Sequence, residues 1–413
     1  MTVNHLVLTG DALDMLTGLP DDSFHGMLTD PPYGLGFMGK RWDHSVPSAE
    51  VWAEALRVLK PGAYGLVFGG TRTWHRLAVA LEDAGFALRD TLMWVYGSGF
   101  PKSHDVSKAI DRAAGAERQA VGVKRSGLSM NPNLNDDGWA NAGAGEDGKC
   151  VPITTPATSE AERWDGYGTA LKPAWEPILL VRKPPDGTVA SNAVQHGTGA
   201  LNIDGTRVGD TVETWPKSRS FAPGISAGYT TGVTKGPTQS TGEVPRGRWP
   251  ANLIHDGSDE VLEGFPDSKG RVGMTQHGSG TNDVYGKFAR TAKSFVSDGK
   301  PDEGSAARFF YAAKVSKQER VAGTDGNSHP TLKPIALTEY LARLILPPGD
   351  DTRILTPFSG AGSEMIGALK AGWSHATGID ADPEFVEIAL ARLRHWTGAA
   401  AADSSPLFAE EQS

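Results

Sequence analysis

Short apolar runs alternate with amphipathic segments at both ends of the chain, and this alternation restricts the fold. The first part has strand-like runs at 6–8, 24–28, 64–68 and 88–96, with helical spacing at 12–19, 48–59 and 71–84 between them. The last part continues with a strand at 353–356, a helix at 364–370, a strand at 375–379 and a helix at 383–394. Strand and helix in alternation predict a doubly wound, Rossmann-like α/β sheet.

The apolar run at 24–28 ends abruptly in the sequence TDPPYG. Pro31 and Pro32 have no N–H to donate to a ladder, and each fixes φ near about −65°, so the backbone turns out of the sheet. Ligands of open α/β sheets bind beyond the carboxyl ends of the strands, so Asp30, Pro31 and Tyr33 should face a substrate. The alternative is a plain turn, because Asp-Pro and Pro-Pro are common turn dipeptides.

A second candidate ligand site is the sequence PFSGAGS at 357–363. Gly360 and Gly362 allow the backbone to approach a ligand closely, and the helix that starts near Ser363 offers free N–H groups. Asp380 ends the next strand, where its carboxylate can hold both hydroxyls of a ribose. Taken alone, such a glycine turn also fits an NAD-binding protein.

Two residues near the amino end have alternative roles. Asp11 follows the first strand and predicts a helix N-cap, a polar contact to a bound nucleotide, or both together. Phe37 lies in the glycine-punctuated stretch LGFMGKRWD, at 35–43. Its ring either folds back onto the domain or belongs to a mobile flap that contacts a ligand.

Composition narrows the class of protein further. The net charge of −9 argues against a protein that coats nucleic acid by charge alone. The positive charge is relatively concentrated in residues 101–320, which carry 27 basic and 26 acidic side chains against 13 and 23 in the flanks. Cys150 is the single cysteine and the histidines form no HxxxH pair, so we expect no metal site. Without an apolar stretch of eighteen residues or a leader, we expect a cytoplasmic protein and no membrane contact.

Long segments rich in Gly, Pro, Ser and Thr interrupt the alternating pattern. A stretch at 126–160 should stay mobile, whereas 175–183 should be a strand. The 175–183 sequence resembles a strand that similar enzymes pair antiparallel with the preceding sheet strand, and this resemblance implies a place beside 88–96. Aromatic and basic residues interleave in 184–320, which suits a target recognition region. The expected parts are a catalytic half (1–96), a mobile insertion (97–172), a sheet strand (173–183), a target recognition region (184–320), a cofactor-binding half (321–396) and a disordered tail (397–413).

Four motifs carry a family resemblance. DPPY resembles motif IV of the DNA amino-methyltransferases, and PFSGAGS resembles their motif I. The GID at 378–380 resembles motif II, and the HPTLKP at 329–334 resembles motif X. Their order, with DPPY first, is similar to that of the circularly permuted β class, and a dehydrogenase would not carry DPPY. The resemblance implies S-adenosylmethionine as cofactor and double-stranded DNA as substrate.

The resemblance also assigns roles to residues. The Asp30 carboxylate and the Pro31 carbonyl would accept the N–H groups of the target amine, and Tyr33 would offer its ring to a flipped base; Pro32 completes the catalytic set. Lys333 would suit the carboxylate of the cofactor's methionine. The cofactor-binding set is Asp11, Lys333, Thr356, Phe358, Gly360, Gly362, Ser363 and Asp380. The DNA-binding set is Phe37, Arg246, Arg248 and Trp249, with packing onto the core and burial of Trp249 as the alternative.

One position departs from the family pattern. The strand before the glycines usually ends in an Asp that holds the cofactor's ammonium, and here that residue is Thr356. Either cofactor binding is weaker, or Asp380, Glu364 or a backbone carbonyl supplies the interaction. A DNA-binding protein without turnover would also fit Thr356, although an intact DPPY speaks against it.

The target is expected to be adenine N6, because cytosine-N4 enzymes more often carry Ser at the position of Asp30. Cytosine-N4 methylation is the alternative activity, and RNA or a small molecule is a third substrate class. The sequence leaves open a homodimer, a restriction partner and the recognition sequence.

Overall fold

The structure is a computed structural model. It describes residues 4–36, 43–99, 103–125, 150–212, 246–269, 303–313, 319, 322–324 and 332–398. Phe37 of the predicted DNA-binding set and residues 329–331 of the HPTLKP motif lie outside this set. Most of the predicted mobile stretch, and much of the predicted recognition region, lie outside it as well.

A nine-stranded sheet forms the centre of the larger unit, and its first strands along the sheet are parallel. In spatial order the strands are β1 (Asn4–Thr9), β15 (His375–Asp380), β14 (Arg353–Pro357), β2 (Phe24–Thr29), β3 (Leu59–Phe68), β7 (Trp175–Arg182), β4 (Ala87–Val95), β10 (Leu253–His255) and β13 (Tyr311–Ala312). The predicted Rossmann-like α/β sheet is therefore confirmed. Strands from the two ends of the chain are interleaved, which places the ends of β2 and β14 side by side.

Strand β7 runs antiparallel to both of its neighbours, β3 and β4. Its place beside the 88–96 strand was predicted, but its insertion between β3 and β4 was not. Because β7 is reversed, its first residues lie at the edge where the parallel strands end. Trp175 is paired with Val95 there.

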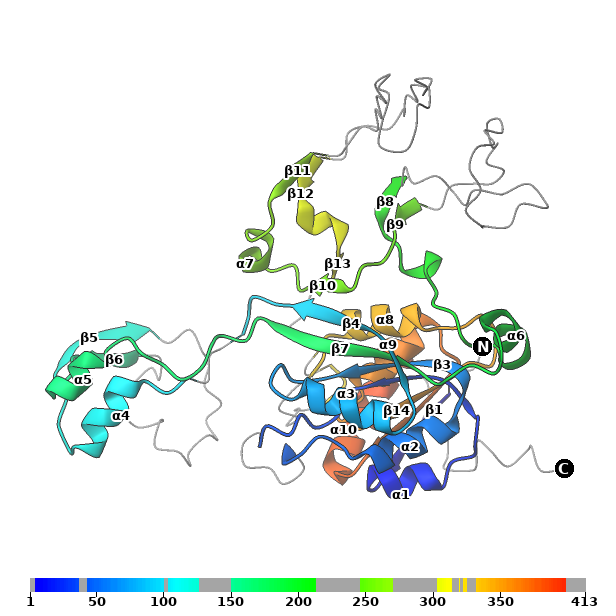
Figure 1. Cartoon of the computed structure of the whole chain (residues 1–413), viewed down its shortest axis with the longest axis horizontal. Helices are drawn as coiled ribbons and strands as arrows, with labels where there is room; N and C mark the ends of the chain where they lie inside the picture. Colours follow the sequence, from blue (N-terminus) through cyan, green and yellow to red (C-terminus); the bar gives the residue numbers. More distant parts are fainter. Residues whose placement is uncertain are drawn as a thin grey trace, which may run out of the picture. The chain divides into compact units, whose positions relative to one another are not determined.

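Helices cover both faces of the sheet (Figure 1). On one face lie α1 (Ala12–Thr17), α2 (Ala49–Val58) and α3 (Trp74–Asp83), which bury Leu16, Trp52 and Leu77 against the sheet. On the other face, α8 (Ile335–Leu344), α9 (Ser363–Ala371) and α10 (Pro383–Thr397) bury Leu341, Met365 and Leu393. Burial of apolar area on both faces fixes the sheet as a rigid platform for its loops.

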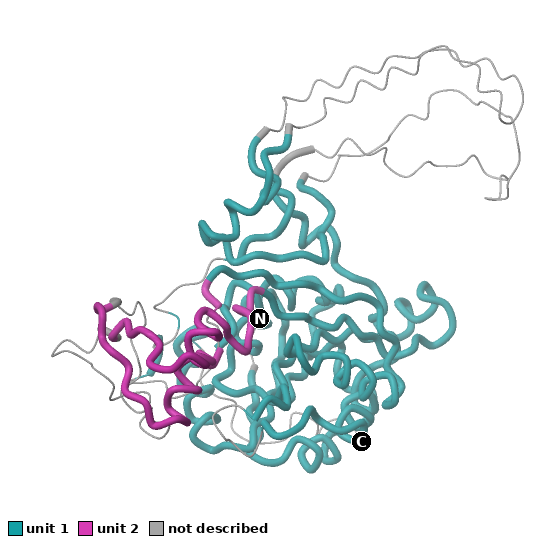
Figure 2. The backbone as a smooth tube through the Cα atoms, turned by 60° about the vertical axis from the view of Figure 1, so that its left-hand side comes forward, with its two compact units in different colours: residues 1–97, 175–413 teal, residues 98–174 magenta. Residues whose placement is uncertain are grey.

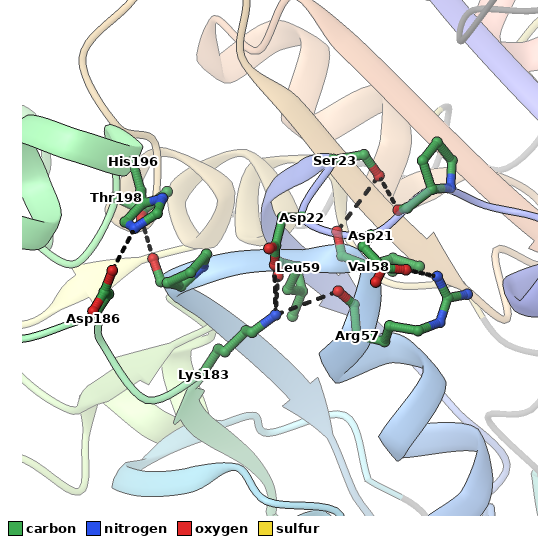
Figure 3. A network of polar contacts seen from close by, with 12 residues as sticks. Asp21, Asp22, Ser23, Arg57, Val58, Leu59, Lys183, Asp186, His196 and Thr198 are labelled. Carbon is green, nitrogen blue, oxygen red and sulfur yellow. Dashed lines mark hydrogen bonds and ion pairs between the residues drawn. The ribbon is translucent and has the colours of Figure 1, made fainter. Parts of the chain in front are cut away.

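A polar network ties the opposite, amino-terminal edge together (Figure 3). The Lys183 ammonium donates to Asp22 at 2.7 Å and to the carbonyls of Leu59 at 2.6 Å and Arg57 at 3.3 Å. The Arg57 guanidinium in turn bonds Asp21 and the carbonyls of Leu16 and Leu19. This network joins the end of β7 to the start of β2 and the end of α2.

The predicted mobile insertion is a compact unit of its own, residues 98–174 (Figure 2). It contains α4 (Val106–Ala113), α5 (Ser159–Arg163) and the antiparallel pair β5 (Ala120–Arg125) and β6 (Cys150–Thr154). Residues 150–160 of the stretch predicted to be mobile include β6 and the start of α5, and their mobility stays a prediction. Asp111 organises the unit, because its buried carboxylate accepts from Arg118 at 2.6 Å and from both N–H and hydroxyl of Thr158.

The segment 184–320 is more regular than its composition predicted. Strands β10 and β13 extend the main sheet beyond β4. The other elements of the segment are α6 (Val189–His196), β8 (Val208–Val212), β9 (Arg246–Arg248), α7 (Asp259–Leu262), β11 (Asp267–Lys269), β12 (Glu303–Ser305) and two 3-10 turns at Asp204–Thr206 and Ala306–Phe309. Part of the predicted recognition region thus belongs to the platform itself.

Two kinds of feature are absent from the described ranges. None of the helices there is both long and apolar enough to cross a membrane. The same residues contain no group of three or more His, Cys, Asp or Glu side chains placed to hold a metal ion.

Candidate functional site

The conformation of the loop that follows β2 is fixed by a single buried side chain. Asp43, 2% exposed, accepts hydrogen bonds from the backbone N–H groups of Tyr33 at 2.8 Å, Gly34 at 2.9 Å and Leu35 at 3.2 Å. Its own carbonyl accepts from Gly36 at 2.8 Å. The prolines end the strand as predicted, and Asp43 then fixes the loop that presents Asp30 and Tyr33.

Asp30 lies in a compact charged cluster at the carboxyl edge of the sheet. The Lys333 ammonium is 2.7 Å from Asp30 Oδ2 and 3.2 Å from Glu176 Oε2. The Tyr33 hydroxyl is 2.7 Å from Asp30 Oδ1 and 3.1 Å from Glu176 Oε2, and the Lys333 ammonium is 3.0 Å from it. Four side chains from three distant segments therefore share one network.

Electrostatics in this cluster are strong because the groups are buried. Burial alone would lower the pKa of Lys333, but the charges of Asp30 and Glu176 raise it above its ordinary value. Burial and the same two carboxylates raise the pKa of the Tyr33 hydroxyl well above its usual range. Burial and then Glu176 raise the pKa of Tyr96 to about 12. Lys333 is thus held as a cation and both tyrosines as neutral phenols.

Asp380 stabilises the glycine turn after β14 through both of its carboxylate oxygens. Oδ2 accepts from the Gly360 N–H at 2.7 Å and Oδ1 from the Asp382 N–H at 2.9 Å. Gly362 is the N-cap of α9 with φ of 77°, a conformation that glycine adopts without strain. A Cβ on Gly378 would lie 2.9 Å from Ser359 Cβ and 2.4 Å from Met365 Sδ, so β15 passes very close to the turn and to the helix that follows it.

Phe358 adopts φ of 61°, which is unusual for a residue with a bulky side chain. Its ring packs edge to face on Trp52 with centroids 6.2 Å apart. Strained backbone of this kind costs about 1–3 kcal/mol and persists where the surroundings impose it. The surrounding packing therefore imposes the backbone conformation of Phe358 at the start of the glycine turn.

The remaining predicted cofactor residues lie around the same edge. Asp11 is the N-cap of α1 and accepts from the Leu13 N–H at 2.9 Å, so the capping role is confirmed. Ser363 begins α9, and its hydroxyl accepts from the buried Arg392 guanidinium at 3.1 Å. The hydroxyl of Thr356 is fully buried and has no hydrogen-bond partner among the described residues.

Lys333 differs from its predicted surroundings in one respect. The resemblance implied a partner on the cofactor, whereas the structure gives its ammonium partners on the protein, Asp30 and Glu176. Its role toward a cofactor stays a prediction.

Of the predicted DNA-contacting residues, two have described side chains. Trp249 is 58% exposed, and the Arg207 guanidinium lies over its ring at 5.6 Å. Burial of Trp249, the alternative interpretation, is therefore wrong. Arg248 lies over the Phe309 ring at 4.8 Å and donates to the Arg308 carbonyl at 3.2 Å, so it helps to hold its own segment together. The backbone of Arg246 lies in β9.

Sequence reasoning missed Glu176 and Asp43. Glu176 is the second residue of β7, and it reaches the site only because that strand is reversed. The antiparallel placement of 175–183 was predicted, so the position of Glu176 at the carboxyl edge could have been inferred from it. Asp43 gave no signal, because its partners are backbone N–H groups.

Comparison with known proteins identifies the family. The family model N6_N4_Mtase, for DNA methylases, matches residues 24–391. The Type II methyltransferase M.HindIII of Haemophilus influenzae is 25% identical over 242 residues, which is 48% of this chain and 64% of that protein. The structure of TTHA0409 from Thermus thermophilus with S-adenosyl-L-methionine is 14% identical, covers 97% of this chain and 99% of its own, and has a TM-score of 0.38. PvuII DNA methyltransferase, which is cytosine-N4-specific, is 12% identical, covers 98% and 97% and has a TM-score of 0.43. With the family model spanning most of its length, the chain belongs to the N6/N4 DNA methylase family.

Proposed function

We propose that this protein transfers a methyl group from S-adenosylmethionine to the exocyclic amine of a base in double-stranded DNA. The observation that carries the proposal is the pairing of β2 with β14. This pairing sets Asp30 and Tyr33, an acceptor and an aromatic ring, one strand away from the glycine turn. In chain order the Asp30 half precedes the glycine half, and this order supports the permuted β class.

The residues around the glycine turn suit S-adenosylmethionine. This cofactor has a ribose diol, a sulfonium, an ammonium and a carboxylate. Asp380 is placed to accept from a diol, because a carboxylate has about four lone-pair sites and backbone N–H groups occupy two here. The hydroxyls of Thr356 and Ser359 beside the turn are buried and have no hydrogen-bond partner in the described part of the chain.

The chemistry required of the protein is positioning and charge stabilisation. The bound cofactor supplies a methyl group activated by its sulfonium. Asp30 accepts an N–H from the aromatic amine and stabilises the positive charge that grows on nitrogen, while the Pro31 carbonyl takes the second N–H. Lys333 and the Tyr33 hydroxyl fix the Asp30 carboxylate. Flipping the target base into this site costs a few kcal/mol, which contacts with the Tyr33 ring offset.

Adenine N6 is the proposed target, and Asp30 is the feature that favours it. Cytosine-N4 enzymes more often carry Ser at this position, and cytosine N4 remains the second candidate. Both chemistries use the same acceptors, so only the product distinguishes them. Long-read sequencing of host DNA after expression identifies the base and its context together. N6-methyladenine at a defined motif is the expected result, and N4-methylcytosine would overturn the base assignment while leaving the reaction class intact.

We also propose that the segment from β8 to β13 reads the DNA sequence, with Trp249 as a contact. Its large exposed ring beside the Arg207 guanidinium suits stacking on a base or wedging into a step. In Trp249→Ala, methylation should fall at least about tenfold or spread to new sites, with the melting temperature and cofactor affinity maintained. Unchanged rate and context would place recognition elsewhere.

A further inference from the structure

Glu364 is a buried carboxylate whose charge lacks a close partner. It is the second residue of α9, directly after Gly362 and Ser363, and it is 4% exposed. Its carboxylate accepts from its own backbone N–H, and no ion pair within 4.0 Å joins it to any other described residue. A carboxylate in this position needs a cation, because burying an unpaired charge is costly.

The other carboxylates of this edge are already engaged. Asp11 caps α1, Asp30 is paired with Lys333, and Asp380 holds the turn N–H groups. Glu364 is therefore the carboxylate that has most to gain from a positively charged ligand.

The charged groups that act on Glu364 come from three elements, and neither cation among them lies within ion-pair distance of its carboxylate. Asp30 at the end of β2 repels it, while Lys333 before α8 and Arg392 on α10 attract it from beyond ion-pair distance. Burial, followed by the charge of Asp30, raises the pKa of Glu364 to about 7. Lys333 is paired with Asp30. Arg392 donates through Nη1 to the Ala361 carbonyl and the Ser363 hydroxyl, while its Nε and Nη2 are buried without a hydrogen-bond partner among the described residues.

Thr356 lies on the same side of the sheet as α9. Side chains alternate along a strand, and Ile354, two residues earlier, packs in the same core as Met365 and Ile366 of α9. The hydroxyl of Thr356 is buried there without a partner among the described residues. The end of β14 and the start of α9 therefore carry a neutral hydroxyl and an ionisable carboxylate, and both groups can accept a hydrogen bond from an ammonium.

We infer that Glu364 binds the ammonium of the methionine part of S-adenosylmethionine, in place of a carboxylate at position 356. The inference rests on the proposed cofactor site at the glycine turn. The inference also predicts that Glu364 loses its proton when the ammonium of the ligand binds. Below about pH 7, binding of an amino-bearing ligand should release a proton.

Calorimetry with two ligands tests the assignment. S-adenosylhomocysteine has the ammonium, and its desamino analogue carries hydrogen in that place. We expect wild-type protein at pH 8 to bind S-adenosylhomocysteine about 10- to 100-fold more tightly than the analogue, the range for a hydrogen bond to a charged group. In Glu364→Gln this preference should fall to within about threefold. Glu384→Gln is the matched control, because Glu384 occupies the same second position of α10 but is exposed.

A preference that persists unchanged in Glu364→Gln would overturn the inference, as would equal weakening of both ligands. Asp380→Asn separates this outcome from failure of the site itself, since it should weaken both ligands alike. If Asp380→Asn changes the affinity for neither ligand, the proposed cofactor site is wrong. Proton release is measured on the wild type in buffers of different ionisation enthalpy at pH 6, so it does not depend on a folded variant. Release with S-adenosylhomocysteine alone supports Glu364, and equal release with both ligands contradicts it.

Discussion

Lys333 balances the charge of the candidate site at the scale of single residues. Its side chain is 7% exposed, and its single positive charge is shared by ion pairs with two carboxylates, Asp30 and Glu176. We expect Lys333→Gln to destabilise the protein by about 3–5 kcal/mol, because breaking a buried pair leaves uncompensated charge. A second substitution, Glu176→Gln, should recover part of the loss. Urea unfolding at pH 7 of the two single variants and the double variant measures these free energies. Strictly additive losses would show that Lys333 and Glu176 do not interact.

Glu364 makes the stability of the ligand-free protein depend on pH. Its pKa is about 7 in the folded protein against an ordinary 4.5, so the folded state retains a proton that the unfolded state releases. The stabilisation is complete below about pH 4.5 and is lost as the pH rises through 7. Glu364→Gln should match the wild type near pH 5 and exceed it at pH 8, by on the order of 1–3 kcal/mol. Unfolding free energies at both pH values, with Glu384→Gln as control, measure this. A difference that does not grow with pH would contradict it.

The sequence predicted Asp30, Tyr33 and the glycine turn because their chemistry is local. Proline ends a strand wherever it occurs, and glycine permits a positive φ in any context. The network around Lys333 was not predictable in the same way. Lys333 meets Asp30 across 303 positions of sequence, so only the order of strands in the sheet brings the two together.

At the scale of elements, the two edges of the sheet have separate tasks. The amino-terminal edge holds the Lys183 network, whereas the loops at the carboxyl edge carry the site. Lys183→Met should therefore lower the unfolding free energy by about 1–2 kcal/mol, through loss of charged hydrogen bonds. Affinity for S-adenosylmethionine should be unchanged. The exposed Lys370→Met, on α9, is the control for removal of a lysine, and a cofactor affinity reduced tenfold by Lys183→Met would contradict the separation.

The order of strands and helices was predictable where the two alternate along the chain. Composition alone did not predict the strands and helices of the insertions. The abundance of Gly, Ser and Thr suggested loops in both insertions, yet β6 and α5 are regular and β10 and β13 join the main sheet. These elements are short, and their stability comes from tertiary pairing that a local pattern does not reveal.

At the scale of the whole molecule, the unit at 98–174 is an insertion at one end of a strand pair. Val95 and Trp175 are partners in the ladder, so their backbones are already adjacent. A turn of about four residues should replace 98–174, because such turns commonly join antiparallel strands. The shortened chain should melt cooperatively and bind S-adenosylmethionine within about threefold of the parent. Calorimetry and thermal melting measure both, and an unfolded product would show that the larger unit depends on the insertion.

Asp30→Ala is the variant that most directly separates cofactor binding from methyl transfer. Asp30 is assigned to the target amine and not to the cofactor, and its removal leaves Lys333 paired with Glu176. Single-turnover methylation of duplex DNA by Asp30→Ala, with the cofactor dissociation constant measured on the same preparation, addresses both at once. We predict a rate at least about 100-fold lower, as expected for loss of a preorganised electrostatic contact, with cofactor affinity within a few-fold of the wild type. Methylation at a rate near that of the wild type would contradict the assignment of this edge as the active site.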